Sequence, residues 1–336
     1  MKVCSVVAAI AGFVVIAALV THFGLAAVMR SLGAIGWTGF VAICLIHLGL
    51  IAVMGIAWGA LLPAAPIWAP IWGRLVRDSG SELLPFSQIG GYVLGARAIN
   101  LAGVSGTAAA ASTIVDVTLE VFAQLAYTAL ALGVLVYLRP GAAVVVPVAI
   151  GLIVAGLLAS AFVLVQRREL RLLDRLARIL GRGWADKTAA TATTLQAALQ
   201  QIYRWRGRVW VNFLLHLVCW IASAFEAWIA LRLGGVSLGF PAVLVIESLL
   251  YAARSAAFIV PNAVGVQEGA YVLIGAGFGL TPEMGLALSL LKRGRDLAVG
   301  LPPLAAWQLL ESSRLWASRG PSLQLRSGNL KTKPRP

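Results

Sequence analysis

Long apolar runs separated by short polar connections are the main feature of this chain. A helix needs about 20 consecutive apolar residues to cross the hydrocarbon core of a bilayer. Runs of this kind lie at 3–20, 37–62, 107–138, 142–165, 209–231 and 282–310, the last with charged residues in its middle. The pattern predicts an all-α, polytopic membrane protein whose chain crosses the membrane several times.

Two other apolar stretches, 83–106 and 240–280, are interrupted by glycine, proline and polar residues. Irregular backbone at membrane depth is tolerated only where it is buried in protein or lines a water-filled cavity. We therefore expect two broken or re-entrant segments, and about 6–8 transmembrane helices in all. The hinge residues of the two breaks are expected to be Gly103, Gly106, Pro261, Gly265 and Gly269.

The composition agrees with a chain that lipid surrounds. Hydrophobic residues make up 60% of the 336 residues and charged residues 12%, against about 25% charged in a typical soluble domain. The three cysteines and three histidines have no paired spacing, which predicts neither a disulfide framework nor a metal site. No Walker motif is present, so we expect no ATP and no other cofactor.

Arginine and lysine are concentrated in two segments, and this asymmetry predicts the topology. The polar loop 166–208 holds nine arginines and one lysine, and the tail 313–336 is also basic. Because such loops stay in the cytoplasm, we expect a multi-pass inner-membrane protein with both termini cytoplasmic. One transmembrane domain, 1–312, is expected to precede a disordered tail. The topology rule also accounts for the net charge of +14, and no motif for binding nucleic acid accompanies it.

Within that loop, 167–182 is predicted to form an amphipathic helix. One face carries arginine and another carries leucine. Such a helix suits the surface of an anionic leaflet. A solvated helix that only sets the topology has the same pattern.

Charged residues inside the apolar segments are the strongest functional signal. A charge at the centre of the bilayer costs about 3 kcal/mol on insertion scales, so these groups are expected to pair, to face a wet cavity, or both. Static ion pairs that hold helices together are the alternative. Asp116 and Glu120 share one helical face, whereas Glu226 and Glu247 are the least constrained and can each be placed near a membrane edge. The full set is Asp116, Glu120, Glu226, Glu247, Glu268, Asp296, Arg97, Arg254, Lys292, Arg293 and Arg295.

Two parts of the chain look alike. Ala96-Arg97 and Ala253-Arg254 each precede a glycine-broken turn that leads towards a helix with a buried aspartate, Asp116 or Asp296. Under the predicted topology the two units begin on opposite sides of the membrane. This is the arrangement of an inverted repeat, in which broken helices meet near the midplane and bind the substrate.

The second unit resembles a known family. The residues that carry the resemblance are Arg254-x6-Pro261-x3-Gly265-x2-Glu268, followed by Arg295-Asp296. They are similar to the transmembrane region of the lysylphosphatidylglycerol synthases, a family that includes the flippase domain of the MprF proteins. The resemblance covers 5–312, nearly the whole chain.

A narrower match lies in 81–91, 95–98 and 265–273, which are similar to the hopanoid-biosynthesis-associated membrane proteins of HpnL type. The sequence departs from the family in two respects. The turn at 261–263 reads Pro-Asn-Ala where the family commonly has Pro-Gly-Gly. The tail cannot supply a cytosolic aminoacyl-transfer domain, so synthase activity is not expected and the chain is not expected to be an enzyme.

The resemblance implies that this chain flips or transports a lipid across the bacterial inner membrane, with a hopanoid or its precursor as cargo. Membrane lipids are the expected partners, together with lipid-biosynthesis proteins. Arginine forks suit phosphate or polyol oxygens of a headgroup, and Glu268 is our first candidate for coupling transport to protons. The groove for the headgroup is expected to comprise Arg97, Asn100, Asp116, Glu120, Arg254, Glu268, Arg293, Arg295 and Asp296.

Two other classes of function are open. A membrane-embedded transferase would act on a polyprenyl or hopanoid lipid, with Asp78 and Glu82 binding a metal-phosphate donor. Two acids four residues apart are also common in solvated loops. A non-catalytic scaffold for a lipid-biosynthesis complex is the third interpretation.

Overall fold

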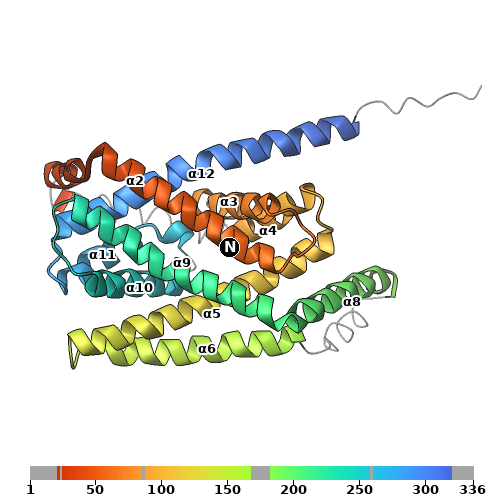
Figure 1. The fold of residues 1–336 in the computed structure, drawn as a ribbon, viewed down its shortest axis with the longest axis horizontal. Coiled ribbons are helices and arrows are strands. Elements are labelled where there is room, and N and C mark those ends of the chain that lie inside the picture. Colours follow the sequence, from red (N-terminus) through yellow and green to blue (C-terminus); the bar gives the residue numbers. More distant parts are fainter. Residues whose placement is uncertain (1–20, 23–24, 85–87, 168–181, 258–259, 320–336) are drawn as a thin grey trace, which may run out of the picture.

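The computed structural model describes the chain apart from residues 1–20, 23–24, 85–87, 168–181, 258–259 and 320–336. The described residues therefore do not include the predicted first span, nearly all of the predicted arginine-rich helix and most of the tail. The described residues form helices joined by short connections, with no strand among them (Figure 1). The elements are α2 (Leu25–Ala60), α3 (Trp68–Leu83), α4 (Gln88–Leu101), α5 (Gly106–Leu138), α6 (Val145–Arg167), α8 (Arg182–Arg204), α9 (Arg206–Leu233), α10 (Phe240–Ala256), the 3-10 turn η1 (Pro261–Ala263), α11 (Val266–Ala276) and α12 (Pro282–Arg319).

Four of the described helices are long and apolar enough to cross a membrane, namely α2, α5, α6 and α9. Their bounds lie close to four of the predicted runs, which confirms the all-α membrane architecture. α2 begins earlier than predicted, because it continues through Gly36, where a φ of 66° kinks the helix. α12 is 38 residues long and carries a charged middle. It is not among the four, and the total of 6–8 transmembrane helices stays a prediction.

α6 shows most directly that lipid is the solvent of this protein. None of the residues in its most apolar stretch is buried inside the protein. Ile153, Leu157 and Leu158 are 63%, 66% and 67% exposed. In water, so large an exposed apolar surface would drive association. This face of α6, at the outer edge of the bundle in Figure 1, therefore lies against lipid tails.

Two helical hairpins lie between the long helices, and glycines determine how closely the first one packs. A Cβ on Gly91 of α4 would lie 2.0 Å from Ser81 Oγ of α3, and a Cβ on Gly95 would lie 2.7 Å from Arg77 Cβ. Small residues allow such close approach of helices in membranes. The second hairpin consists of α10, η1 and α11. The hairpins overlap the predicted broken segments, and that they re-enter the membrane stays a prediction.

The long helices and hairpins form two units with matching contacts, α2–α5 and α9–α12. Within the units, α3 packs on α4, and α10 packs on α11 in the same way. Between the units, α12 packs on α2 and α3, and α5 makes the matching contacts with α9 and α10. α2 and α9 run antiparallel (Figure 1). Arg208 at the start of α9 bonds to the Ala60 carbonyl oxygen at the end of α2, and Gly234 after α9 lies beside Ile35. The pattern supports the predicted inverted repeat.

The register of this repeat differs from the predicted one. The sequence comparison paired Arg97 with Arg254. However, Arg97 lies in the second helix of its hairpin, α4, and Arg254 lies in the first helix of the other hairpin, α10. The pairing of Asp116 with Asp296 agrees with the contacts, because α5 and α12 occupy matching places. Apolar glycine-rich helices resemble one another at many offsets, so a local match selected the wrong helix.

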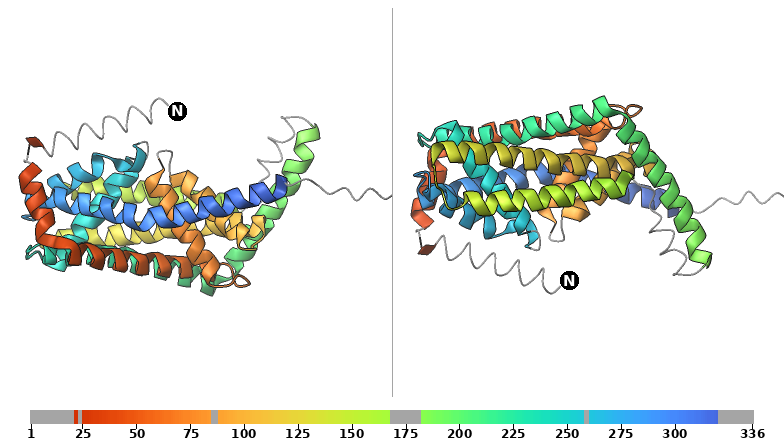
Figure 2. Two further views of the ribbon diagram at one scale, coloured as in Figure 1. Left: turned by 90° about the horizontal axis from the view of Figure 1, so that it is seen from above. Right: turned by 90° about the horizontal axis from the view of Figure 1, so that it is seen from below.

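α6 and α8 lie outside the two units. α8 extends away from one end of the bundle (Figure 2). Its last turns return to the bundle, where Leu199, Ile202 and Tyr203 pack in one apolar cluster with Leu119 of α5 and, at its edge, Val163 of α6. This packing fixes the junction between α6, α8 and α9 against α5.

Candidate functional site

Buried ion pairs between α3 and α5 form the first of several charged groups in the protein. Arg77 Nη1 donates to Asp116 Oδ2 at 2.7 Å, and its Nη2 donates to Glu120. Arg74 Nη2 donates to Glu120 Oε1 at 2.8 Å, and its Nε donates to Asp78 Oδ2 at 2.8 Å. We call these five residues, with the α9 side chains described next, the α3–α5 cluster.

α9 completes the α3–α5 cluster from the other side of Asp116. Asn212 Nδ2 donates to Asp116 Oδ1 at 2.7 Å and also contacts the Ala57 carbonyl oxygen at 2.8 Å. His216 Nε2 lies 2.9 Å from the same Asp116 oxygen. Because a carboxylate only accepts, this contact assigns the His216 hydrogen to Nε2. Asp116, Asn212 and His216 are all fully buried.

The α3–α5 cluster also contains residue types that can bind a metal ion. Ligand atoms of Asp116, Glu120 and His216 lie within 4.8 Å of one another, which is compact enough to hold an ion. Both carboxylates, however, already bind guanidinium groups of Arg74 and Arg77. Two fixed positive charges beside the acids would repel a cation, so the geometry fits an ion-pair cluster and not a metal centre.

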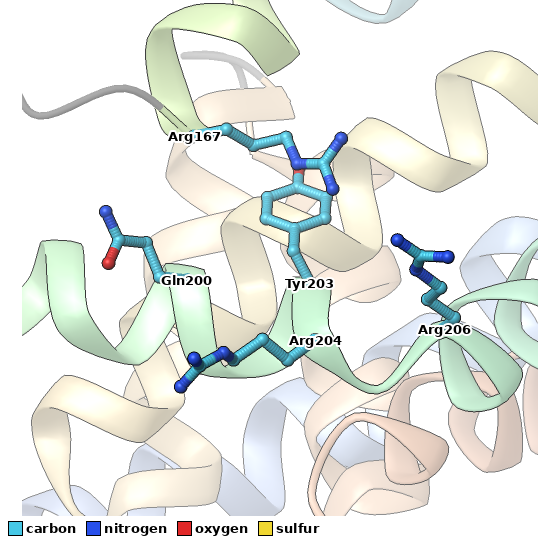
Figure 3. A pocket seen from close by; sticks show the side chains of 5 residues that line it. All are labelled: Arg167, Gln200, Tyr203, Arg204 and Arg206. Carbon is cyan, nitrogen blue, oxygen red and sulfur yellow. The ribbon is translucent and has the colours of Figure 1, made fainter.

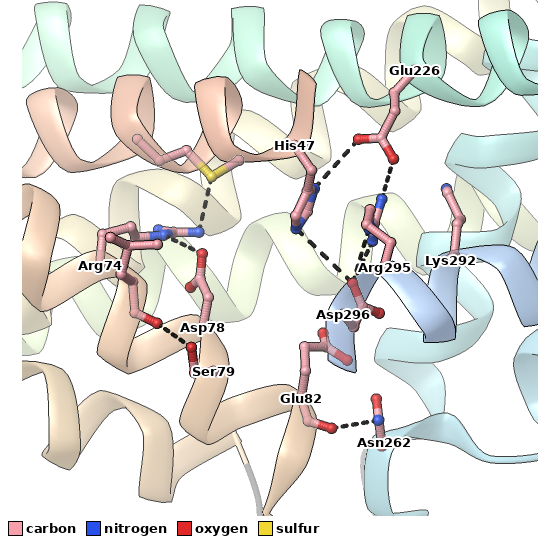
Figure 4. A network of polar contacts seen from close by, with 12 residues as sticks. His47, Arg74, Asp78, Ser79, Glu82, Glu226, Asn262, Lys292, Arg295 and Asp296 are labelled. Carbon is pink, nitrogen blue, oxygen red and sulfur yellow. Dashed lines mark hydrogen bonds and ion pairs between the residues drawn. The ribbon is translucent and has the colours of Figure 1, made fainter. Parts of the chain in front are cut away.

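A second group, the α9–α12 cluster, links α2, α9 and α12 (Figure 4). Arg295 Nη1 donates to Glu226, and its Nη2 donates to Asp296 Oδ1 at 2.6 Å. His47 Nδ1 lies 3.3 Å from Glu226 Oε2, and its Nε2 lies 4.0 Å from Asp296 Oδ1. The exposure expected for Glu226 at a membrane edge is not found, because its side chain is only 1% exposed. Burial forces it to find a cationic partner.

The two clusters are related by the repeat. In the α3–α5 cluster, His216 of α9 faces Asp116 of α5. In the α9–α12 cluster, His47 of α2 faces Asp296 of α12. In both clusters the first helix of one unit supplies the histidine, and the last helix of the other unit supplies the aspartate. The ion pairs therefore join the two units to each other as well as holding each unit together.

Two further acids hold α10, α11 and α12 together. Glu247, also expected near an edge, is fully buried and binds Lys292 and the Tyr271 hydroxyl. Glu268 Oε1 accepts from Arg293 Nε at 2.6 Å and from Ser289 Oγ at 2.9 Å.

The other carboxylate oxygen of Glu268, Oε2, also accepts a hydrogen bond from the backbone. Oε2 accepts from the backbone N–H of Gly265 at 2.8 Å, at the start of α11. A carboxylate at a helix N-terminus is stabilised by the unpaired N–H groups and the helix dipole. Glu268 therefore fixes the break between η1 and α11 as well as pairing with Arg293.

The ends of the two hairpins meet at a contact that we call the tip contact. Arg254 Nη2 lies 3.0 Å from both Glu82 carboxylate oxygens and 3.3 Å from Asn262 Oδ1. Asn262 Nδ2 donates to the Glu82 carbonyl oxygen at 2.6 Å (Figure 4). The side chains of Arg254 and Glu82 are 15% and 32% exposed, so this ion pair is more open than those of the two clusters.

The predicted groove residues do not all gather in one place. Asp116 and Glu120 belong to the α3–α5 cluster, Arg295 and Asp296 to the α9–α12 cluster, Glu268 and Arg293 pair at the start of α11, and Arg254 lies in the tip contact. Arg97 stands apart. It is 46% exposed and binds Glu311 at 2.9 Å and Asn100 at 3.3 Å.

The predicted hinge residues fall into two kinds. Gly103 and Gly265 have φ values of 100° and 81°, which glycine adopts without strain. Gly103 lies in the turn between α4 and α5, and Gly265 directly precedes α11. Pro261 begins η1, and Gly106 begins α5. Gly269 lies inside α11, where its N–H bonds to the Gly265 carbonyl oxygen in the normal helical pattern.

Several buried partners were missed from the sequence. Arg74 and Arg77 are three residues apart on one face of a strongly amphipathic helix, and this spacing was a usable signal. Asn212 and His216 are four apart on the buried face of α9, which also carries Glu226, and could have been found in the same way. His47 and Tyr271 are isolated in sequence, and only the packing of α2 and α11 shows their partners.

These features define a polytopic α-helical membrane protein whose interior is joined by ion pairs between two repeated units. The chain belongs to the family described as the lysylphosphatidylglycerol synthase transmembrane region, which it matches over residues 5–303. The family membership indicates a function that concerns membrane lipids. No curated protein and no solved structure matched the chain.

Proposed function

We propose that this protein moves an amphiphilic lipid across the bacterial inner membrane. The observation that carries the proposal is the tip contact, in which the ends of both hairpins meet around Arg254 and Glu82. In transporters built from inverted repeats, broken helices meet near the midplane and their ends bind the substrate. The similarity to HpnL-type proteins makes a hopanoid or its precursor the proposed cargo.

Headgroup binding at the tip contact follows from the chemistry of its residues. The Arg254 guanidinium offers a planar fork of donors that phosphate or polyol oxygens can accept from in place of Glu82. Arg293 is a second partly exposed cation, 18% exposed, and is held by Glu268. Oxygens of the headgroup would replace the carboxylate oxygens of Glu82 and Glu268 at these two arginines. Each guanidinium would therefore keep a partner while the lipid passes.

The buried clusters support a rocking mechanism in this proposal. Each cluster contains fully or nearly fully buried carboxylates with two or more partners, and breaking such pairs is costly. The partly exposed tip contact is a weaker link between the units than either buried cluster, since exposed pairs contribute little to stability. Motion of one unit against the other would therefore open the tip contact before it breaks the clusters.

The transferase alternative has less support from the geometry. Asp78 is bound by Arg74, and Glu82 is bound by Arg254 and by Asn262 through its backbone. A metal-phosphate donor needs carboxylates that are available to the ion. In this structure both acids already neutralise arginines.

Leaflet exchange in proteoliposomes tests the proposal. The purified full chain is reconstituted with fluorescent phospholipid, polyprenyl phosphate or hopanoid probes, and exchange is followed by quenching of the outer leaflet. Arg254→Ala and Glu268→Gln are expected to slow exchange by about tenfold or more, equivalent to about 1.4 kcal/mol in the barrier. Arg139→Ala is the matched control, because Arg139 is exposed and its guanidinium stacks on Phe278, away from the tip contact.

The outcomes separate the candidate functions. No exchange of any of the three probes by the parent protein would overturn the transport proposal. Formation of a new lipid product from a probe and an activated donor would favour the transferase. Exchange that Arg139→Ala slows as much as Arg254→Ala would show that the tip contact has no special role.

A further inference from the structure

A basic pocket lies at the junction of α6, α8 and α9, away from the residues that carry the proposed function. It has a volume of about 400 Å³ and is lined by Arg167, Gln200, Tyr203, Arg204 and Arg206. In Figure 3 the Arg167 guanidinium lies over the Tyr203 ring, with Gln200 and Arg204 to one side and Arg206 to the other. Three arginines thus surround one aromatic ring.

Its arginines differ from those of the protein interior. Arg167, Arg204 and Arg206 form no ion pair with any acid among the described residues, and all three are exposed. By contrast, Arg77 pairs with two carboxylates and Arg74 with three. Within the described part of the chain, therefore, no acid compensates the positive charge of the basic pocket, and an anion can neutralise it.

The floor of the basic pocket is fixed by buried contacts. The Arg167 guanidinium lies 5.4 Å from the centre of the Tyr203 ring, and the Tyr203 hydroxyl donates to the Gln166 side chain. Gln166 in turn accepts from Gln196 and donates to Thr118 of α5 at 3.0 Å. Burial raises the pKa of Tyr203 to about 12, so the hydroxyl stays neutral and keeps this role near neutral pH.

An apolar pocket of about 420 Å³ adjoins the basic pocket and shares Arg167, Tyr203 and Arg206 with it. α5 contributes its floor, and α6 and α9 contribute its walls. The remaining lining residues are Leu119, Phe122, Ser160, Val163, Leu164, Val209 and Trp210. It opens beside the exposed apolar face of α6, where lipid tails lie.

We propose that the two pockets together bind one anionic phospholipid, with its phosphate on Arg167, Arg204 and Arg206 and an acyl chain in the apolar pocket. A free phosphate would leave the apolar pocket empty, and a lipid without net charge would leave the arginines uncompensated. Only an amphiphile with a negatively charged phosphate headgroup fits both parts at once.

This site is separate from the transport path and does not rest on the proposed function. The bound lipid would hold α6, α8 and α9 together at the membrane surface on the side of α8. By the predicted topology this is the cytoplasmic leaflet, whose lipids include anionic ones. Loss of the site would therefore change lipid retention without requiring any change at the tip contact.

The test uses the full chain, delipidated in detergent, with dioleoyl phosphatidylglycerol as the probe and native mass spectrometry as the readout. Phosphatidylglycerol is expected to bind at least about tenfold more tightly than dioleoyl phosphatidylcholine. Inorganic phosphate at the same concentration is expected not to displace it. Equal binding of the two lipids would overturn the charge half of the proposal, and displacement by inorganic phosphate would overturn the acyl-chain half.

Variants locate the site. The double substitution Arg204→Gln with Arg206→Gln is expected to weaken phosphatidylglycerol binding by about tenfold or more. The matched control removes two exposed arginines elsewhere, Arg30→Gln with Arg232→Gln, and is expected to bind as the parent does. An equal loss in both double variants would show nonspecific charge attraction and would contradict the site.

The apolar pocket is tested in the same way. Ser160→Trp places a large side chain in the pocket and is expected to lower phosphatidylglycerol binding. Leu157→Trp is the control, because Leu157 lies on the same helix but does not line the pocket. Both residues are exposed to lipid, so unchanged thermal unfolding in detergent confirms that any loss of binding is local. Binding retained in Ser160→Trp would contradict the placement of the chain.

Discussion

Nη2 of Arg254 in α10 lies 3.0 Å from both carboxylate oxygens of Glu82 at the end of α3. Asn262 reinforces this ion pair through its hydrogen bond to the Glu82 carbonyl oxygen. The three residues come from both hairpins, so a motion of one unit against the other has to break these contacts. Transport by rocking can therefore be tested at this one place.

Locking the tip contact should stop transport. In a variant whose Cys4, Cys44 and Cys219 are replaced by serine, Glu82→Cys and Asn262→Cys introduce a pair that a short bifunctional thiol reagent can join. Because the joined hairpins can no longer separate, leaflet exchange in proteoliposomes is expected to fall to the protein-free rate.

The two single-cysteine variants, treated with the same reagent, are the controls for this crosslink. Each should exchange lipid as fast with the reagent as the same variant does without it, since neither can join the hairpins. Undiminished exchange in the fully crosslinked pair would mean that the hairpins stay together during transport, and the rocking mechanism would be abandoned.

Removing one arginine from the α3–α5 cluster should destabilise the protein strongly. Arg77→Met leaves Asp116 and Glu120 buried with fewer cationic partners, which is expected to cost about 3–5 kcal/mol. Arg97→Met is the control, because Arg97 is 46% exposed and pairs with Glu311 at the surface. Its cost should stay below about 1 kcal/mol. Unfolding in detergent micelles measures both, and equal small losses would show that the cluster does not support the fold.

These ion pairs show how far the sequence predicts the interior. That Asp116 and Glu120 share a face and need cations follows from helical spacing and the cost of charge in lipid. Their partners do not follow, because they depend on which helix packs against α5. The sequence favoured arginines inside apolar segments, such as Arg97, whereas α3 supplies Arg74 and Arg77.

Close packing of the first hairpin should make one glycine sensitive and its neighbour tolerant. Gly91→Ala places a Cβ 2.0 Å from Ser81 Oγ and 2.5 Å from the Arg77 carbonyl oxygen, so helix α4 has to move away from α3. Overpacking of this kind is expected to cost about 1–3 kcal/mol. Thermal unfolding in detergent is the measurement.

Gly90→Ala is the matched control for this substitution. A Cβ on Gly90 would meet nothing within 4 Å, and alanine favours a helix over glycine by about 1 kcal/mol. Its stability should equal or exceed that of the parent. A loss as large as that of Gly91→Ala would mean that backbone effects in α4, and not contact with α3, set the cost.

The turn at 261–263 has a backbone conformation that suits glycine, although it contains no glycine. The sequence has Pro-Asn-Ala in place of the family's Pro-Gly-Gly, which made the turn geometry hard to predict. Asn262 and Ala263 have φ values of 51° and 45°, and they are the two non-glycine residues with positive φ in the described part of the chain. Both residues thus adopt a left-handed conformation that suits glycine, and contacts of Asn262 with Glu82 and Arg254 help to hold it.

Ala263 should therefore tolerate glycine and reject a branched side chain. Ala263→Gly removes the steric cost of a left-handed residue, about 1–2 kcal/mol, and loses a small buried methyl group worth about 0.8 kcal/mol. Its stability in detergent should change by less than about 1 kcal/mol. Ala263→Val keeps the same positive φ with a β-branched side chain, for which this region is a true outlier, and should cost about 2 kcal/mol or more. If both substitutions destabilised the protein equally, the turn would owe its shape to packing around the Ala263 methyl group and not to its backbone conformation.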